Sequence, residues 1–391
     1  MGNCLRKLKV EQLNQEITNA AAPPTQPLPS ESYSAEHMNC LPLRERNGNL
    51  SSVCLKTSNE LKGRERVNRC QPGPWDSVLT SKKEEMFHAY RLHCFCYSVL
   101  KEATHKFSSK NLVGEGGFGD VYKGWINPCT MTATKENNGS IVAVKRLRRT
   151  GAQGHKEWLN ELRFLSEFNH PNIVKLIGYC CEDQQRILVY EYMLRGSLEE
   201  LLFGENNQEL SWSRRIRIAL GAARGLEYLH EHAEPVIHRD IKASNILLDG
   251  DFTAKLSDFG LARLGPQDDR SYVSTRVLGT KGYFAPEYIG TGHLTLQTDT
   301  YSFGIVLLEI FSGSSAITKY SDGNGVNLAQ WARPYLSSKL ELHHIMDRRL
   351  GMKFPLEKAH NFTKITLRCL HMNPKNRPTM AEVVTDLEQL L

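Results

Sequence analysis

The sequence predicts an α+β protein with two lobes, the first built mainly from strands and the second from helices. Short apolar runs rich in β-branched residues predict strands in the front half. These runs lie at 121–123, 141–145 and 187–190. Longer stretches with helical periodicity follow, at 155–168, 214–231, 301–312 and 380–391. Segregation of strands and helices along one chain favours two packed lobes.

Composition excludes several classes of protein. The chain has 391 residues, 40% of them hydrophobic and 24% charged, which is ample for a sizeable core. Its net charge of +6 is small for this length, so we expect no nucleic-acid partner. No apolar run approaches the ~20 residues of a membrane helix. The ten cysteines do not show zinc-ligand spacing, and we expect reduced thiols.

The first part of the chain differs from the rest. Residues 1–94 contain an Ala-Ala-Ala-Pro-Pro run at 20–24 and no sustained periodicity, which predicts a mostly disordered arm. A short helix is expected at 99–106. The folded domain is then expected over 95–391, with a front lobe of about 95–192 and a back lobe of about 193–391.

A glycine cluster follows the first predicted strand residues of this domain. Its members are Gly114, Glu115, Gly116, Gly117, Phe118, Gly119 and Val121. Glycines let a backbone approach phosphate oxygens and point N–H groups at them. A dinucleotide-binding turn has the same spacing, and a plain flexible loop is a further alternative. Because a strand rather than a helix follows, a hairpin over a nucleotide is the better interpretation.

Lys145 lies on the next predicted strand, and Glu161 lies on the helical segment after it. An ammonium group on that strand can bind the α- and β-phosphates of a nucleotide when a carboxylate orients it. Such a pair in isolation is more often a surface ion pair. The order of the later motifs decides between the two interpretations.

The later motifs are specific. His238 to Asn245 matches H-R-D-x-x-x-x-N, with Asp240 at the catalytic position and Asn245 as a metal ligand. Asp258-Phe259-Gly260 supplies a second carboxylate ligand for the metal. It also begins the activation segment, which Ala285-Pro286-Glu287 ends. Magnesium suits this oxygen-only ligand set.

With these motifs in place, the chain resembles the eukaryotic protein kinases, and within them the plant receptor-like cytoplasmic kinases of subfamily VII. The resemblance covers roughly residues 95–391. It rests on the segments 107–124, 154–158, 170–176, 188–193 and 376–380, in addition to the motifs above. It implies the two-lobed kinase fold, ATP and Mg²⁺, and the activity of a non-specific serine/threonine protein kinase (EC 2.7.11.1) on protein substrates.

The resemblance also implies roles for single residues. Tyr190 matches the gatekeeper behind the adenine pocket, and Met193 matches the hinge residue that meets adenine. The expected hydrophobic spine between the lobes consists of Leu165, Leu176, His238 and Phe259. Glu287 and Arg377 match the buried ion pair of the large lobe.

Five positions concern specificity and regulation. Lys242 and Thr280 match the serine/threonine-specific pattern, in which the lysine neutralises the γ-phosphate. Arg239 beside the catalytic aspartate requires an anion, and a phosphate on the segment 272–280 is the usual one. The candidate phosphorylation sites are Ser274, Thr275 and Thr280.

The amino terminus indicates lipidation. Gly2 is a candidate for myristoylation and Cys4 for palmitoylation, with basic residues following them. The usual myristoylation pattern has Ser or Thr at the sixth position, where this chain has Arg6. We expect the cytoplasmic face of the plasma membrane, with a solvated arm and a cytoplasmic protein as the alternative.

Two classes of function remain to be compared. The first is an active kinase in signalling downstream of receptor kinases, as the resemblance implies, in plant immunity or growth. The second is a pseudokinase-like scaffold that binds partners without phosphate transfer. Lys145, Glu161, Asp240, Asn245 and Asp258 are all present, which favours the enzyme.

Overall fold

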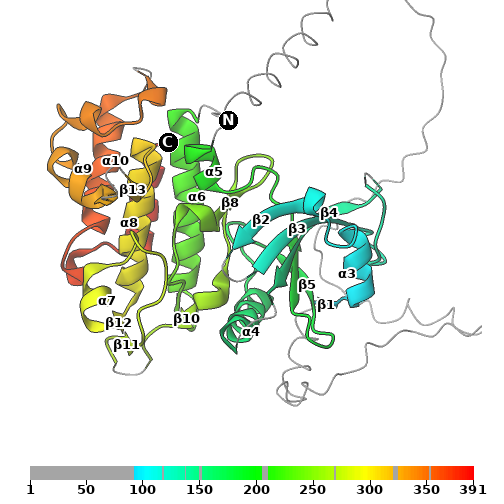
Figure 1. Cartoon of the computed structure of the whole chain (residues 1–391). Helices are drawn as coiled ribbons and strands as arrows, with labels where there is room; N and C mark the ends of the chain where they lie inside the picture. Colours follow the sequence, from blue (N-terminus) through cyan, green and yellow to red (C-terminus); the bar gives the residue numbers. More distant parts are fainter. Residues whose placement is uncertain are drawn as a thin grey trace, which may run out of the picture. The chain divides into compact units, whose positions relative to one another are not determined.

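The computed structural model describes residues 92–391, except for 117–118, 137, 149–151, 205–209, 268–269, 320–324 and 352–353. The lipidation candidates Gly2 and Cys4 and nearly all of the predicted arm therefore lie outside the described residues. Within the described ranges, strands dominate the first part of the domain and helices the second, as predicted (Figure 1).

The front lobe contains a six-stranded sheet in the order β1-β5-β6-β4-β3-β2. The strands are β1 (His93–Cys94), β2 (Leu112–Gly116), β3 (Gly119–Ile126), β4 (Ser140–Leu147), β5 (Leu176–Cys180) and β6 (Ile187–Glu191). The three predicted strand runs are parts of β3, β4 and β6. β1 pairs with β5 in parallel, whereas the other neighbours are antiparallel.

The two faces of this sheet are buried by different helices, because successive side chains of a strand point to opposite faces. One face packs with α3 (Tyr97–Ala103), and its buried side chains are Val142, Val144, Ile187 and Val189, with Leu100 of the helix. The other face packs with α4 (Ala152–Glu167), and here Leu188 and Tyr190 meet Trp158 and Leu162 in the main core. These contacts fix the position of α4 against the sheet.

The helix expected at 99–106 begins and ends earlier than predicted, because α3 spans Tyr97–Ala103. His105, Lys106 and Phe107 have φ angles of 51°, 64° and 55°, which no right-handed helix contains. Thr104 stabilises this exit, since its hydroxyl donates to the Leu100 carbonyl at 2.7 Å and accepts from the Phe107 N–H at 3.1 Å.

The back lobe is helical. Its helices are α5 (Leu198–Phe203), α6 (Trp212–His230), α7 (Pro286–Thr291), α8 (Leu296–Ser312), α9 (Leu328–Leu336), α10 (Leu356–Cys369) and α11 (Met380–Glu388). From Thr298 to Ser312, α8 is buried all round, so it forms the centre of the lobe, with α6 and α10 beside it in Figure 1. None of the helices in the described ranges is long and apolar enough to cross a membrane.

Short two-stranded ladders form within the loops that connect the helices of the back lobe. The ladders are β7 (Val236–Ile237) with β10 (Arg263–Leu264), β8 (Ile246–Leu248) with β9 (Ala254–Leu256), β11 (Val273–Ser274) with β12 (His293–Leu294), and β13 (Ile317–Lys319) with β14 (Gly325–Asn327). Two single-turn 3₁₀ helices lie among them, η3 (Ala243–Asn245) and η4 (Phe259–Leu261). The HRD and DFG motifs therefore sit on loops held by the β7–β10 and β8–β9 ladders.

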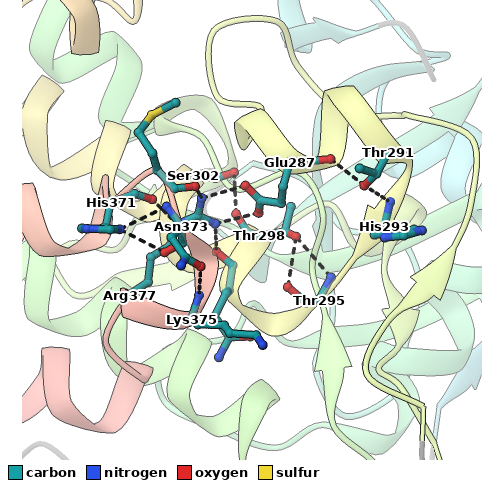
Figure 2. Close-up of polar contacts among 12 residues, drawn as sticks. Glu287, Thr291, His293, Thr295, Thr298, Ser302, His371, Asn373, Lys375 and Arg377 are labelled. Carbon is teal, nitrogen blue, oxygen red and sulfur yellow. Dashed lines mark hydrogen bonds and ion pairs between the residues drawn. The ribbon is translucent and has the colours of Figure 1, made fainter.

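The expected ion pair of the large lobe is formed. Arg377 Nη1 and Nη2 donate to Glu287 Oε1 and Oε2, each at 2.7 Å (Figure 2). The same guanidinium donates to the carbonyls of Gln297 and His371 at 2.9 and 2.8 Å and lies 4.9 Å from the ring centroid of Tyr301. It joins α7 to the loop before α11 and to the start of α8.

Candidate active site

The glycine cluster forms a β-hairpin, as predicted. β2 and β3 pair antiparallel, with Gly116 opposite Gly119, and no helix follows. A Cβ on Gly119 would lie 2.4 Å from the Arg146 carbonyl oxygen, so this position requires glycine. A Cβ on Gly114 would meet no atom within 4 Å, which leaves space beside the β2 backbone.

The other predicted members of the cluster have different positions. Glu115 lies opposite Asp120 in the hairpin, and Val121 lies opposite Lys145 of β4. Gly117 and Phe118 lie outside the described residues. The hairpin thus lies directly against the strand that carries the predicted nucleotide-binding lysine.

Lys145 joins the two lobes through two carboxylates. Its Nζ lies 2.8 Å from Glu161 Oε2 of α4 and 2.7 Å from Asp258 Oδ1 of the DFG motif. The alternative of an exposed surface pair is excluded, because the side chain of Lys145 is 15% exposed and that of Glu161 is 4% exposed.

Lys145 and Asp258 stabilise each other's charged forms. Burial alone would lower the pKa of Lys145, but the charges of Asp258 and Glu161 outweigh it and raise that pKa. Burial would raise the pKa of Asp258, but the Lys145 ammonium outweighs it and lowers that pKa. Lys145 is therefore a cation and Asp258 an anion, as binding of phosphates and of a metal ion requires.

A second cluster surrounds the predicted catalytic aspartate. Asp240 Oδ2 lies 2.8 Å from Lys242 Nζ and accepts a 3.2 Å hydrogen bond from Asn245 Nδ2. Asp240 Oδ1 accepts a 2.7 Å hydrogen bond from the Thr280 hydroxyl, and Lys242 Nζ donates to that same hydroxyl oxygen at 3.0 Å. The structure thus brings Thr280 to three side chains of the His238–Asn245 motif, forty residues earlier in the chain.

Asp299 of α8 stabilises the catalytic loop, residues 238–245, through its backbone. The sequence motifs did not reveal this role. The Asp299 carboxylate accepts hydrogen bonds from the backbone N–H groups of His238 at 2.7 Å and of Arg239 at 2.8 Å. Arg239 has a φ of 72°, a left-handed conformation that costs energy for any residue except glycine. The hydrogen bonds of Asp299 keep the loop in this conformation beside Asp240.

The predicted spine residues are all buried, with Leu165, Leu176 and Phe259 in the main core and His238 against Phe259. The rings of His238 and Phe259 lie edge to face, with centroids 4.8 Å apart. Phe168, which the sequence did not single out, also contacts Phe259, at 5.8 Å between centroids. Aromatic contacts therefore fix Phe259 between the lobes.

Tyr190 and Met193 lie where the two lobes join. Both are buried, with 6% and 7% of their surfaces exposed. Burial, followed by the charge of the neighbouring Glu161, raises the pKa of Tyr190 well above its usual value. Tyr190 is therefore a neutral phenol beside the Lys145–Glu161 pair.

The activation segment brings one candidate phosphorylation site to two arginines. The Thr275 hydroxyl accepts hydrogen bonds from Arg239 Nη2 at 3.1 Å and from Arg263 Nη1 at 3.2 Å. Ser274 is exposed and makes no such contact among the described residues. The involvement of Arg263 was not predicted, because only the β7–β10 pairing places it near Arg239.

Comparison with known proteins agrees with this geometry. The family model described as protein tyrosine and serine/threonine kinase matches residues 107–387. Receptor-like cytoplasmic kinase 176 of Oryza sativa subsp. japonica is 51% identical over 310 residues, covering 79% of this chain and 78% of its own length. Serine/threonine-protein kinase BIK1 of Arabidopsis thaliana is 51% identical over 308 residues, covering 78% of both chains. Probable serine/threonine-protein kinase PBL11 of the same plant is 52% identical over 316 residues, covering 80% and 81%.

The fold and site define a protein kinase. The chain belongs to the protein tyrosine and serine/threonine kinase family, and within it to the plant receptor-like cytoplasmic kinases. It is a serine/threonine-protein kinase that acts on protein substrates and uses ATP with a divalent metal ion. The enzyme is favoured over the pseudokinase-like scaffold.

Proposed function

We propose that Asp240 orients the attacking serine or threonine hydroxyl and accepts its proton as the γ-phosphate is transferred. The observation that carries this proposal is the arrangement of Lys242 and Thr280 around the Asp240 carboxylate, at 2.8 Å and 2.7 Å. A general base needs a fixed carboxylate within hydrogen-bond reach of its proton donor. Lys242 is the nearest cation and neutralises charge on the transferred phosphate.

We propose that Lys145 binds the α- and β-phosphates of ATP and that the backbone of the β2–β3 hairpin covers these phosphates. Two observations support this proposal: Glu161 and Asp258 hold the ammonium group, and the space beside the Gly114 backbone is open. The binding residues in this hairpin would be Gly114, Glu115, Gly116, Gly117, Phe118, Gly119 and Val121. Tyr190 and Met193 would form the wall and hinge of the adenine pocket.

The oxygen atoms at the site fit Mg²⁺. Asn245 Nδ2 donates to the Asp240 carbonyl at 2.9 Å and to its carboxylate, which leaves Asn245 Oδ1 as the free end of the amide. The second protein ligand would be the Asp258 carboxylate. The described ranges contain no group of three or more His, Cys, Asp or Glu side chains that could hold a metal, so phosphate oxygens and water would complete the shell, as Mg²⁺ prefers. When bound, the ion would neutralise phosphate charge.

Transfer of labelled phosphate from ATP to a general acceptor such as myelin basic protein tests this proposal. Acid hydrolysis of the product distinguishes phosphoserine and phosphothreonine from phosphotyrosine. We expect the first two. Phosphotyrosine as the main product would contradict the serine/threonine assignment, and a finding of all three would indicate dual specificity.

We further propose that phosphorylation near Ser274 and Thr275 activates the enzyme. A phosphate on Thr275 would meet Arg239 and Arg263, whose guanidinium groups already reach its hydroxyl. The hydroxyl of Thr280 lies between Asp240 and Lys242, which supports a positioning role there rather than modification. Activity of the Thr275→Ala variant, with and without Ser274→Ala, tests this; activity equal to that of the wild type in the double variant would contradict it.

We propose that the kinase acts at the cytoplasmic face of the plasma membrane, downstream of a receptor kinase, in plant defence signalling. Gly2 and Cys4 would carry myristate and palmitate, and the arm would reach to about residue 94, which is the last residue of β1. The printed names of the relatives, such as receptor-like cytoplasmic kinase 176, support the signalling role. Fractionation of Gly2→Ala tests the anchor: an unchanged membrane fraction would favour a cytoplasmic protein.

A further inference from the structure

Asn160 joins α4 to the segment that follows the DFG aspartate. Its Nδ2 lies 2.6 Å from the Ala262 carbonyl oxygen, 3.0 Å from that of Gly260 and 3.5 Å from that of Phe259. An amide has two N–H donors, so the Gly260 and Ala262 contacts are the hydrogen bonds and the Phe259 contact is marginal. Three carbonyl acceptors also determine which end of the amide faces the turn.

These carbonyls belong to the turn η4 and its exit. Ala262 N–H closes the turn by donating to Phe259 at 3.0 Å, and the later carbonyls of a short helix have no partner inside it. Gly260 allows the close approach, because a Cβ there would lie 3.2 Å from Glu157 Cβ, one turn before Asn160 on α4. The helix and the turn are therefore in direct contact, and Asn160 supplies the polar link.

The Asn160 link lies next to both carboxylates that bind Lys145. Asn160 directly precedes Glu161, and η4 directly follows Asp258. Glu161 and Asp258 are the two carboxylates that bind Lys145, at 2.8 and 2.7 Å. Asn160 thus couples the backbones that carry both carboxylates without touching Lys145 itself.

We propose that Asn160 is a positioning residue for phosphate transfer, which holds α4 and the DFG segment in register so that Glu161 and Asp258 face Lys145 together. Rotation of Phe259 out of its buried site would carry the Gly260 and Ala262 carbonyls away, and both hydrogen bonds would be lost. The side chain therefore favours the arrangement with Asp258 at the site over arrangements with Phe259 displaced. This inference rests on the proposed roles of Lys145 and Asp258.

The test compares Asn160→Ala, Asn160→Asp and Asn160→Gln in the full chain, with Lys156→Ala as a matched control on an exposed position of the same helix. Loss of two neutral hydrogen bonds predicts a decrease in kcat of about tenfold for the Ala variant, with KM for ATP unchanged within twofold. The Asp variant should lose more, since its carboxylate would face three carbonyl oxygens. The Gln variant, which keeps the amide, should lie between Ala and wild type.

A binding measurement separates positioning from mere destabilisation. The probes are an ATP-competitive inhibitor of the class that requires Phe259 outside its buried site, and adenylyl imidodiphosphate with Mg²⁺. For Asn160→Ala and Asn160→Asp, we expect the dissociation constant of the inhibitor, divided by that of adenylyl imidodiphosphate, to fall about tenfold. Lys156→Ala should leave this ratio unchanged. An unchanged ratio in both variants, or a kcat loss that only follows a lower Tm, would overturn the proposal. A wild-type chain without phosphate transfer would instead count against the proposed function.

Discussion

The hydroxyl of Thr280 donates to the carboxylate of Asp240 at 2.7 Å, and Lys242 contacts both of them. This hydrogen bond connects the end of the activation segment to the catalytic loop, forty residues away in sequence. It means that the base can only be fully oriented when the segment is folded against it.

We predict that Thr280→Val lowers kcat by about 10- to 100-fold, because one hydrogen bond to a charged carboxylate is worth roughly 1.5–3 kcal/mol. Thr280→Ser keeps the hydroxyl and should retain most of the activity. Steady-state kinetics with a peptide acceptor check both variants. Equal rates for the Val and Ser variants would show that the hydroxyl does not position Asp240.

Substitution of Asp299, which binds the backbone of the catalytic loop, should lower the stability of the protein strongly. The Asp299 carboxylate is 1% exposed and accepts hydrogen bonds from the N–H groups of His238 and Arg239. Asp299→Ala leaves the buried His238 N–H and the half-buried Arg239 N–H without an acceptor, so we expect a loss of about 3 kcal/mol in the free energy of unfolding. Asp299→Asn keeps one acceptor and should lose less. Urea unfolding measures both, and a loss under 1 kcal/mol in the Ala variant would contradict this role.

The pair of Glu287 and Arg377 offers a direct comparison with an exposed pair of the same type. Arg377 is fully buried and Glu287 half-buried, so Arg377→Ala leaves the Glu287 carboxylate without its partner away from bulk water, and we expect the free energy of unfolding to fall by about 3–5 kcal/mol. Arg377→Lys should not restore it, since an ammonium cannot form the bidentate contact.

The control for that pair is Arg224→Ala. Arg224 binds Glu388 at 2.7 Å, but both side chains are 47% exposed, so the expected loss is under about 1 kcal/mol. Urea unfolding of both variants under the same conditions provides the comparison. Similar losses for Arg224→Ala and Arg377→Ala would show that burial of the Glu287–Arg377 pair does not matter.

Glu309 predicts a pH dependence of stability. Burial raises the pKa of its carboxyl to about 8, although its Oε1 accepts hydrogen bonds from Tyr283 and Ala316 at 2.8 and 2.9 Å. Between the ordinary pKa of about 4.3 in the unfolded chain and about 8 in the folded one, only the folded state holds the proton. The contribution to stability is therefore full at low pH and is lost as the pH rises toward 8.

Glu309→Gln removes this titration. The difference in unfolding free energy between wild type and variant should fall by up to about 1.4 kcal/mol per pH unit between pH 5 and 8. Urea unfolding at four pH values across this range measures it. A difference that stays constant or rises with pH would contradict a protonated Glu309.

Much of the fold and the site could be predicted because linear motifs carry them. The strand runs, the helix bearing Glu161 and the HRD and DFG motifs need only local patterns, and the Lys145–Glu161 contact follows from their order. β1 was not predicted, since two residues are too short for periodicity and pair only through β5.

Contacts between distant segments account for the rest. Asn160 meets the DFG turn, Arg263 meets Thr275, and Asp299 meets Arg239 only because three separate loops converge. Asn160, Arg263 and Asp299 each look like ordinary surface residues in sequence. Packing of α4 and α8 against the loops gives them their partners.

Phosphate transfer by Asp240→Asn tests the central claim most directly. The substitution keeps an oxygen toward Thr280 but removes the proton acceptor, whereas the exposed Asp251→Asn serves as a matched control on a neighbouring loop. We predict a decrease in kcat of at least about 100-fold for Asp240→Asn, with unchanged nucleotide affinity and full activity in Asp251→Asn. Retention of kcat within twofold by Asp240→Asn would contradict the role of Asp240 in this enzyme.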